Sequence, residues 1–193
     1  MMRTDSTGSQ KAPVGPVLLD IARAAIAGAL GEPRVTIPQA PWLLEPGASF
    51  VTLTQRGRLR GCIGSLVARR TLLADVQANA VAAALQDSRF APLARAELAA
   101  TQVEVSVLSA LQPLLFDSQA QALTRLRPGV DGVVLECGGL RSTFLPQVWE
   151  QLPTAEVFMA HLKQKAGLSA DFWSPELRLS CYTVAKYQES DRA

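Results

Sequence analysis

The sequence is poor in histidine and cysteine, and this scarcity argues against several kinds of site. His161 is its only histidine, and its three cysteines, Cys62, Cys137 and Cys181, form no Cys-x-x-Cys pair. Structural zinc sites take four ligands at short spacings, so none is expected from this chain alone. A Ser–His–Asp arrangement has one histidine to draw on, and three scattered cysteines do not make a disulfide framework. We therefore expect this chain to bind no metal and no cofactor.

Long apolar runs and a strong charge of either sign are missing as well. The longest nearly apolar stretch, 14–30, contains Asp20 and Arg23, and it lacks the length and purity of a membrane-spanning helix. No signal-peptide cleavage pattern follows it. The formal net charge of +2 is too small to indicate nucleic-acid binding by itself. These absences predict a soluble, cytoplasmic protein without a membrane partner.

The sequence does contain enough apolar material for a full core, since hydrophobic residues make up 48% of the chain. Their periodicity predicts helices at 16–31, 71–86, 119–126 and 154–165, and strands at 50–55, 58–63, 102–108, 129–137, 140–145 and 178–188. This mixture, with at least two hairpins, predicts an α+β fold. The order hairpin, helix, strand occurs twice, which indicates two similar halves merged into one domain.

The domain is expected to span residues 14–189. Residues 1–13 are small and polar and are predicted to form a disordered arm, and 190–193 a short tail. Four prolines between Glu32 and Gly47 predict an irregular connection. Pro146 is predicted to open a helix that carries Trp149.

The most informative run is Leu59-Arg60-Gly61-Cys62-Ile63-Gly64. If it is a strand, Arg58, Arg60 and Cys62 share one face, with Leu59 and Ile63 on the other. A thiol beside two fixed cations is expected to carry more thiolate and to be a better nucleophile. The alternative is a small buried cysteine at a hairpin, with both arginines solvated.

Other candidates each have two interpretations. Glu104 either faces solvent or lines the cleft of Cys62, as a base or as a partner of Arg60. Asp87 and Arg89 either pair to fix their loop or belong to the site. His161 either packs at the edge of the core or activates the thiol of Cys62. The remaining cysteines lie on apolar strand faces and are expected to be buried.

Six runs together resemble one family: 59–64, 87–93, 103–108, 128–132, 143–149 and 165–168. In this order and spacing the chain is similar to AMMECR domains, and to protein A of the AmmeMemoRadiSam system. Ser88 stands where the family usually has proline, and Ser65 stands where it usually has threonine, which keeps the hydroxyl. The resemblance implies an α+β fold of two βαββ-type halves, with mixed or antiparallel sheets. It also implies a functional centre at the cysteine run, and association with a Memo-like protein and a radical S-adenosylmethionine enzyme.

Three functions remain open from the sequence. The chain is an enzyme subunit or partner with a Cys62-centred pocket, a non-catalytic adaptor that presents a substrate or partner, or a nucleic-acid binder. The last uses the arginines at 56, 58, 60, 69 and 70, but no aromatic residues lie between them for stacking. The predicted catalytic residues are Cys62, Arg60 and Glu104. The predicted binding residues are Arg58, Gly61, Ile63, Gly64, Asp87 and Arg89.

Overall fold

The structure is a computed structural model that describes residues 13–33, 35–37 and 39–189. It divides into two compact units. The first comprises the described part of 1–106 and 186–193, and the second comprises 107–185. The predicted arm, apart from Pro13, and the predicted tail lie outside the described residues. Because the first unit uses both ends of the chain, the second is an insertion between two neighbouring strands, β4 (Gln102–Leu108) and β9 (Val184–Gln188).

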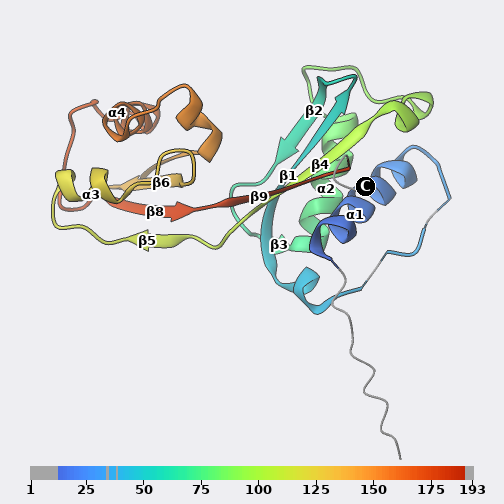
Figure 1. The fold of residues 1–193 in the computed structure, drawn as a ribbon, viewed down its shortest axis with the longest axis horizontal. Helices are drawn as coiled ribbons and strands as arrows, with labels where there is room; N and C mark the ends of the chain where they lie inside the picture. The colour runs from blue at the N-terminus through green and yellow to red at the C-terminus, as the bar shows by residue number, and fades with distance from the viewer. Residues whose placement is uncertain (1–12, 34, 38, 190–193) are drawn as a thin grey trace, which may run out of the picture. The chain divides into compact units, whose positions relative to one another are not determined.

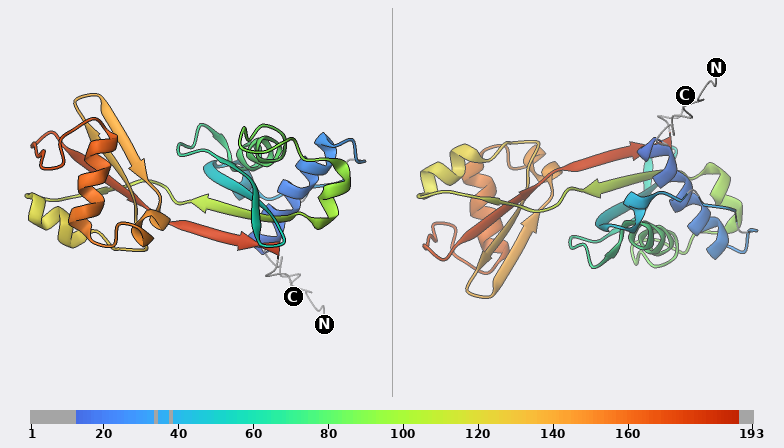
Figure 2. Two further views of the ribbon diagram at one scale, coloured as in Figure 1. Left: turned by 90° about the horizontal axis from the view of Figure 1, so that it is seen from above. Right: turned by 90° about the horizontal axis from the view of Figure 1, so that it is seen from below.

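The first unit is a sheet with two helices on one face (Figures 1 and 2). Its strand order is β2 (Arg58–Gly64), β1 (Pro46–Gln55), β4, β9, and the short β3 (Arg70–Thr71) also pairs with β1. The helices are α1 (Val14–Ala29) and α2 (Leu72–Leu85). Alternate residues of β1 and β4 are buried beneath them: Val51, Leu53, Val103 and Val105. The opposite face of this sheet therefore carries the residues in between.

The β1–β2 hairpin contains an irregularity that sets the faces of its side chains. Its tight turn places Arg56 and Gly57 at positive φ, 50° and 73°, as a type I′ turn requires. Pairing is regular to Thr54↔Leu59 and then continues as Leu53↔Gly61, which leaves Arg60 as an extra residue in β2. This is a β-bulge, and it shifts the facing of every residue that follows.

The second unit has strand order β5 (Gln112–Leu114), β8 (Arg178–Tyr182), β6 (Gly132–Cys137), β7 (Leu140–Phe144). Helices α3 (Gln119–Arg125) and α4 (Ala155–Lys165) pack on it. Its core is centred on Phe158, whose ring stacks on Trp149 with centroids 3.8 Å apart. β5, α3, β6 and β7 follow one another in βαββ order, as the resemblance implies.

Several predictions of local structure need correction. The predicted strand 178–188 is two strands in different sheets, because the chain changes partner at Thr183. There the Ser109 N–H donates to the Thr183 carbonyl, and the Thr183 N–H donates to the Ser109 hydroxyl. The helix expected at Pro146 is a 3-10 helix, η3 (Pro146–Glu150). Four short elements were not predicted: η1 (Pro41–Leu44), η2 (Arg95–Ala100), β3 and β5. Across the residues that the structure describes, no helix is long and apolar enough to cross a bilayer.

Candidate functional site

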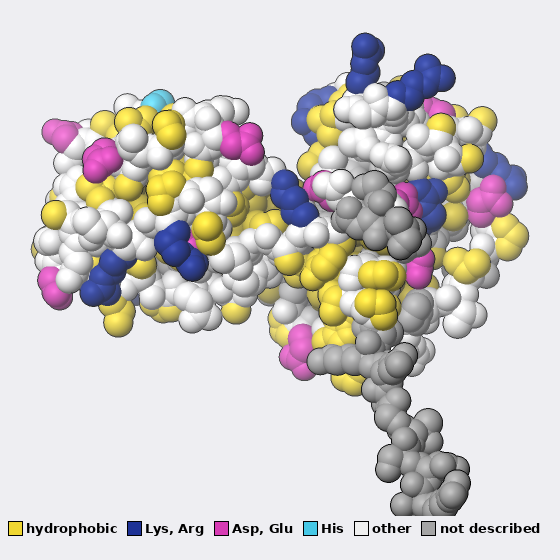
Figure 3. Space-filling view, in the orientation of Figure 1, with side chains coloured by type: hydrophobic (Ala, Val, Ile, Leu, Met, Phe, Trp, Pro, Cys, Tyr) yellow, Lys and Arg dark blue, Asp and Glu magenta, His cyan; other side chains and the backbone are white. Residues whose placement is uncertain are grey.

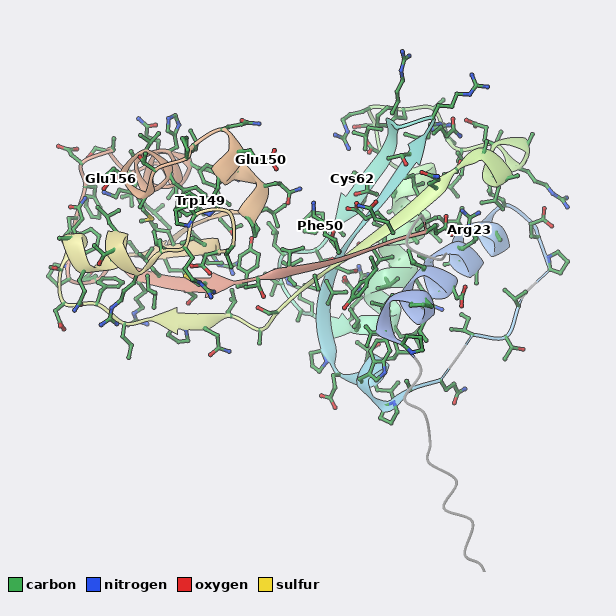
Figure 4. The ribbon with its side chains drawn as sticks, viewed as in Figure 1. Arg23, Phe50, Cys62, Trp149, Glu150 and Glu156 are labelled. Carbon is green, nitrogen blue, oxygen red and sulfur yellow. The ribbon has the colours of Figure 1, made fainter. Side chains whose placement is uncertain are left out.

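Cys62 lies on the face of the first sheet that the helices leave uncovered. It pairs with Thr52, which alternates with the buried Val51 and Leu53 and so points away from α2. The Thr52 hydroxyl donates a hydrogen bond to the Cys62 sulfur at 3.3 Å. Phe50 lies on the same face, two residues along β1, and Figure 4 shows Phe50 and Cys62 on these neighbouring strands. The sulfur is therefore displayed on the sheet surface and is partly exposed.

The backbone of Cys62 is held by the loop that follows α2. β2 is an edge strand among the described residues, where no further strand pairs with the outward N–H and C=O of Cys62. The N–H donates to Oδ2 of Asp87 at 2.8 Å, and Nη2 of Arg89 donates to the carbonyl at 3.2 Å. Two side chains of one loop thus satisfy both groups that a further strand would have bound. They fix the peptide on either side of the thiol.

Asp87 and Arg89 are themselves paired in two-pronged geometry. The guanidinium donates to Asp87 from Nε at 2.9 Å and from Nη2 at 2.7 Å, and the Arg89 backbone N–H adds a bond of 3.1 Å. This guanidinium, followed by the Cys62 N–H, holds the pKa of the buried Asp87 carboxyl well below its usual range. Asp87 therefore stays ionised and keeps both contacts at neutral pH.

Arg60 does not share a face with Cys62, and the prediction that it does is wrong. Its Nε and Nη2 both donate to the carboxylate of Glu97 at 3.1 Å, and its Nη1 donates to the Ala91 carbonyl at 2.9 Å. Gln55 binds the same carboxylate from the helix side of β1. The bulge at Arg60 is the cause, because the strict alternation assumed for 58–63 holds only in a regular strand.

Arg58 likewise pairs with Gln55, a residue of the helix side, and its side chain is exposed at the end of the hairpin. Neither Arg58 nor Arg60 therefore places its positive charge beside the sulfur of Cys62. The guanidinium that reaches Cys62 belongs to Arg89, and it binds the backbone carbonyl.

The two glycines of the run serve opposite faces of the sheet. Gly61 packs on α2, where a Cβ would overlap the carbonyl oxygen of Ala83. Gly64 lies beneath the ring of Phe50 on the Cys62 face, where a Cβ would overlap the ring. Ile63 pairs with Val51 and is directed to the helix side. Of the run 59–64, Cys62 and Gly64 thus lie on the face of the candidate site, whereas Gly61 and Ile63 support it from below.

Glu104 shares the face of Cys62 but does not touch it in the contacts of the described chain. Val103 and Val105 face the helices, so Glu104 and Ser106 face the other way. The carboxylate accepts hydrogen bonds from Gln188 Nε2 at 2.8 Å and from the Ser106 hydroxyl at 3.4 Å. β1 lies between the strands of Cys62 and Glu104. The two strands are therefore two spacings apart across the sheet, about 10 Å.

Comparison with known proteins identifies the group to which this fold and this run belong. The model of the family AMMECR1 matches residues 19–187. The chain belongs to the AMMECR1 family. This confirms the resemblance found in the sequence, and the α+β fold with antiparallel sheets is confirmed as well.

The AMMECR1 relatives match along almost their whole length. A protein of Methanothermobacter thermautotrophicus is 36% identical over 184 residues, which cover 91% of this chain and 94% of that protein. A protein of Thermotoga maritima is 34% identical over 163 residues, 83% of this chain and 88% of its own. The crystal structure of an uncharacterised protein from Pyrococcus horikoshii matches with a TM-score of 0.73 at 30% identity, covering 91% of each chain.

The other cysteines of this AMMECR1 chain differ from Cys62. Cys137 is buried in the core of the second unit, as expected. Cys181 is half-buried, and burial, followed by the charge of Asp131, raises its pKa to about 11. His161 is exposed on α4 in the second unit, so the interpretation that it packs at the edge of the core is wrong. Within the described ranges, no three His, Cys, Asp or Glu side chains cluster so as to hold a metal ion.

Glu97 was missed from the sequence, because its partners come from β1, β2 and its own turn. The Arg60 guanidinium, followed by the Ala94 N–H, lowers its pKa from 4.5 to about 2. Above pH 4.5 the carboxylate is charged in folded and unfolded chains alike, and its contribution to stability is complete. As the pH falls towards 2, the unfolded chain takes up the proton first, so this contribution is lost.

We therefore expect the difference in melting temperature between wild type and Glu97→Gln to be constant above pH 4.5 and to shrink between pH 4.5 and about 2. Thermal melts at a series of pH values measure it. In the Arg60→Gln background, the same comparison of Glu97 with Glu97→Gln should change less with pH over this interval. The reason is that Arg60 is the main cause of the lowered pKa of Glu97. A difference that stays constant down to the lowest pH would show that the Arg60–Glu97 pair does not stabilise the fold in this way.

Proposed function

We propose that this AMMECR1 protein works in an AmmeMemoRadiSam system, as an enzyme subunit or partner of a Memo-like protein and a radical S-adenosylmethionine enzyme, with Cys62 at its working centre. Family membership supports the system assignment through the resemblance of the six sequence runs. The proposal places the protein in the cytoplasm, where cellular reductants keep thiols free, and the described cysteines are all free.

The observation that carries the proposal is how the chain holds one thiol. The sulfur of Cys62 lies on the sheet face opposite α1 and α2 and accepts a hydrogen bond from Thr52, while Asp87 and Arg89 fix its backbone from the edge. A buried structural cysteine needs none of these contacts. A nucleophile gains from them, since a reacting atom held in one position loses less entropy on the way to the transition state.

In this proposal Cys62 is the nucleophile or thiolate ligand, and Thr52 orients its sulfur. Glu104 supplies a carboxylate on the same face, where it takes up a proton from a bound substrate or binds a donor group of that substrate. Arg60 acts at a distance, because it ties the turn that carries Glu97 to β2. Asp87 and Arg89 are positioning residues for the thiol.

The test uses the purified chain with the Memo-like protein and the radical enzyme from the same genome. We expect the three to bind one another, and we expect the radical enzyme to cleave S-adenosylmethionine faster when this chain is present. Cys62→Ser should abolish that stimulation and leave binding unchanged. Failure of the chain to bind either protein would contradict the system assignment.

An adaptor is the second candidate, and the same experiment separates it. If the chain only presents a substrate, Cys62→Ser should bind both proteins and stimulate cleavage as well as the wild type does. The nucleic-acid candidate receives less support. Lys and Arg side chains gather at the end of the β1–β2 hairpin (Figure 3), where Arg56 and Arg58 are exposed, but Arg60 and Arg70 are held by Glu97 and Asp75.

A further inference from the structure

Phe50 covers the strand beside Cys62 with the face of its ring. It pairs with Gly64, and the ring lies over the glycine so closely that any Cβ at Gly64 would overlap it. Cys62 and Gly64 are two residues apart on one face, about 7 Å along the strand. The ring therefore lies on the same sheet face as the thiol, and Phe50 is partly exposed.

A glycine at this position lowers the stability of the strand, so we looked for what it makes possible. Glycine weakens the interior of a strand because it contributes no side chain to packing. At Gly61 the cost has a structural reason, the close approach of α2 to β2. At Gly64 the three atoms nearest to an added Cβ all belong to the ring of Phe50, so the glycine makes room for that ring.

We propose that Phe50 is a specificity-determining residue, and that the site of Cys62 takes a molecule with a flat apolar group, such as an aromatic or unsaturated ring, close to its reacting atom. The flat group stacks on Phe50 while the reacting atom lies over the sulfur. Hydrogen-bond donors of the same molecule reach Glu104 on the far side of Thr52. This inference rests on the proposed function, because it presumes that Cys62 reacts.

The approach to the thiol agrees with this choice. At Cys62 the edge of β2 is occupied by Asp87 and Arg89, so an extended peptide cannot add there as a further strand. A molecule must come from above the sheet face. Its neighbours there are Phe50, Thr52 and Gly64 around the sulfur.

Two maleimides of different shape test the proposal: N-phenylmaleimide, which carries a ring, and N-ethylmaleimide, which does not. In both, the sulfur electron pair forms a bond to one carbon of the ring double bond, and a proton is taken up by the other carbon. The rate of modification of Cys62 is followed by mass spectrometry of its peptide. The ratio of the two rates is divided by the same ratio for glutathione, which removes the intrinsic difference between the reagents.

We expect a normalised ratio of about two- to tenfold in the wild type, the factor that one aromatic pair contributes beyond its area. Phe50→Ala should lower it to about one, and Phe50→Leu, which keeps the site filled, should lower it in part. Gly64→Ala should also lower it, because the new methyl group displaces the ring. Leu59→Ala is the matched control: Leu59 is exposed on the same hairpin, pairs with Thr54, and should leave the ratio unchanged.

The outcomes separate this inference from the function beneath it. A wild-type ratio equal to that of glutathione, or a ratio that Phe50→Ala does not change, overturns the role of Phe50 while Cys62 remains reactive. If Cys62 reacts with neither reagent in the folded protein, the proposed function fails together with the inference. Because the wild-type ratio needs no variant, a variant that does not fold leaves the test intact.

Discussion

Gly61→Ala is expected to destabilise the fold by about 3 kcal/mol or more, at the upper end of what overpacking of a core costs. A Cβ at this position would overlap the carbonyl oxygen of Ala83 in α2 and would lie 3.1 Å from the carbonyl carbon of Ala83. Both partners belong to backbone, so no side chain can turn aside. For a protein of this size the melting temperature should fall by roughly 6–12 °C.

Gly28→Ala is the control for this variant. Gly28 lies in α1, where nothing is within 4 Å of an added Cβ. There the substitution should stabilise the fold by about 0.5–1 kcal/mol, because alanine is a better helix former than glycine. Thermal melting followed by circular dichroism measures both variants. If Gly61→Ala melted with the wild type, α2 would not pack against β2 as closely as the structure has it.

Asp75→Ala should be the second large effect, about 3 kcal/mol, since each buried polar group left without a partner costs about 1–3 kcal/mol. Asp75 is 1% exposed and accepts the Ser49 N–H and the Ser49 hydroxyl, both at 2.7 Å, and the Asn79 amide at 2.9 Å. Arg70 binds its other oxygen at 2.9 Å. The carboxylate thereby joins α2 to β1 and β3.

Two further variants serve as comparisons for Asp75→Ala. Asp75→Asn keeps one oxygen for Ser49 and should lose less than Asp75→Ala. Glu136→Ala breaks an ion pair with Arg141 in which both side chains are exposed, and such pairs contribute below about 1 kcal/mol. Denaturant unfolding compares the three. A loss at Asp75→Ala no larger than that at Glu136→Ala would mean that the buried network does not hold the helix in place.

The sequence could predict most elements of the fold because their patterns are local. Val103, Val105 and Val107 alternate with polar residues, and the structure has β4 there. The helix predicted at 71–86 begins where a threonine can cap it, and the Thr71 hydroxyl accepts the Ala74 N–H at the start of α2. What escaped prediction depends on distant partners: β3 and β5 are strands of two and three residues, too short to show a period.

The candidate site shows the same limit. Cys62 lies in a strand, β2, as predicted, but its neighbours differ from the predicted ones. A regular hairpin with its turn at 56–57 pairs Thr52 with Gly61, whereas the bulge at Arg60 pairs Thr52 with Cys62. One extra residue thereby turns the sulfur to the face of Thr52, while Arg60 stays on the helix side, where it binds Glu97. A bulge of this kind leaves no pattern in the sequence.

Cysteine labelling tests most directly whether Cys62 is a working thiol. The folded chain is treated with a small excess of iodoacetamide near neutral pH, and the modification of its three cysteines is followed by mass spectrometry. We expect Cys62 to react first, because Cys137 is buried and because burial, followed by the charge of Asp131, raises the pKa of the half-buried Cys181. Equal or slower labelling of Cys62 would contradict a reactive centre on the face of β2 opposite the helices.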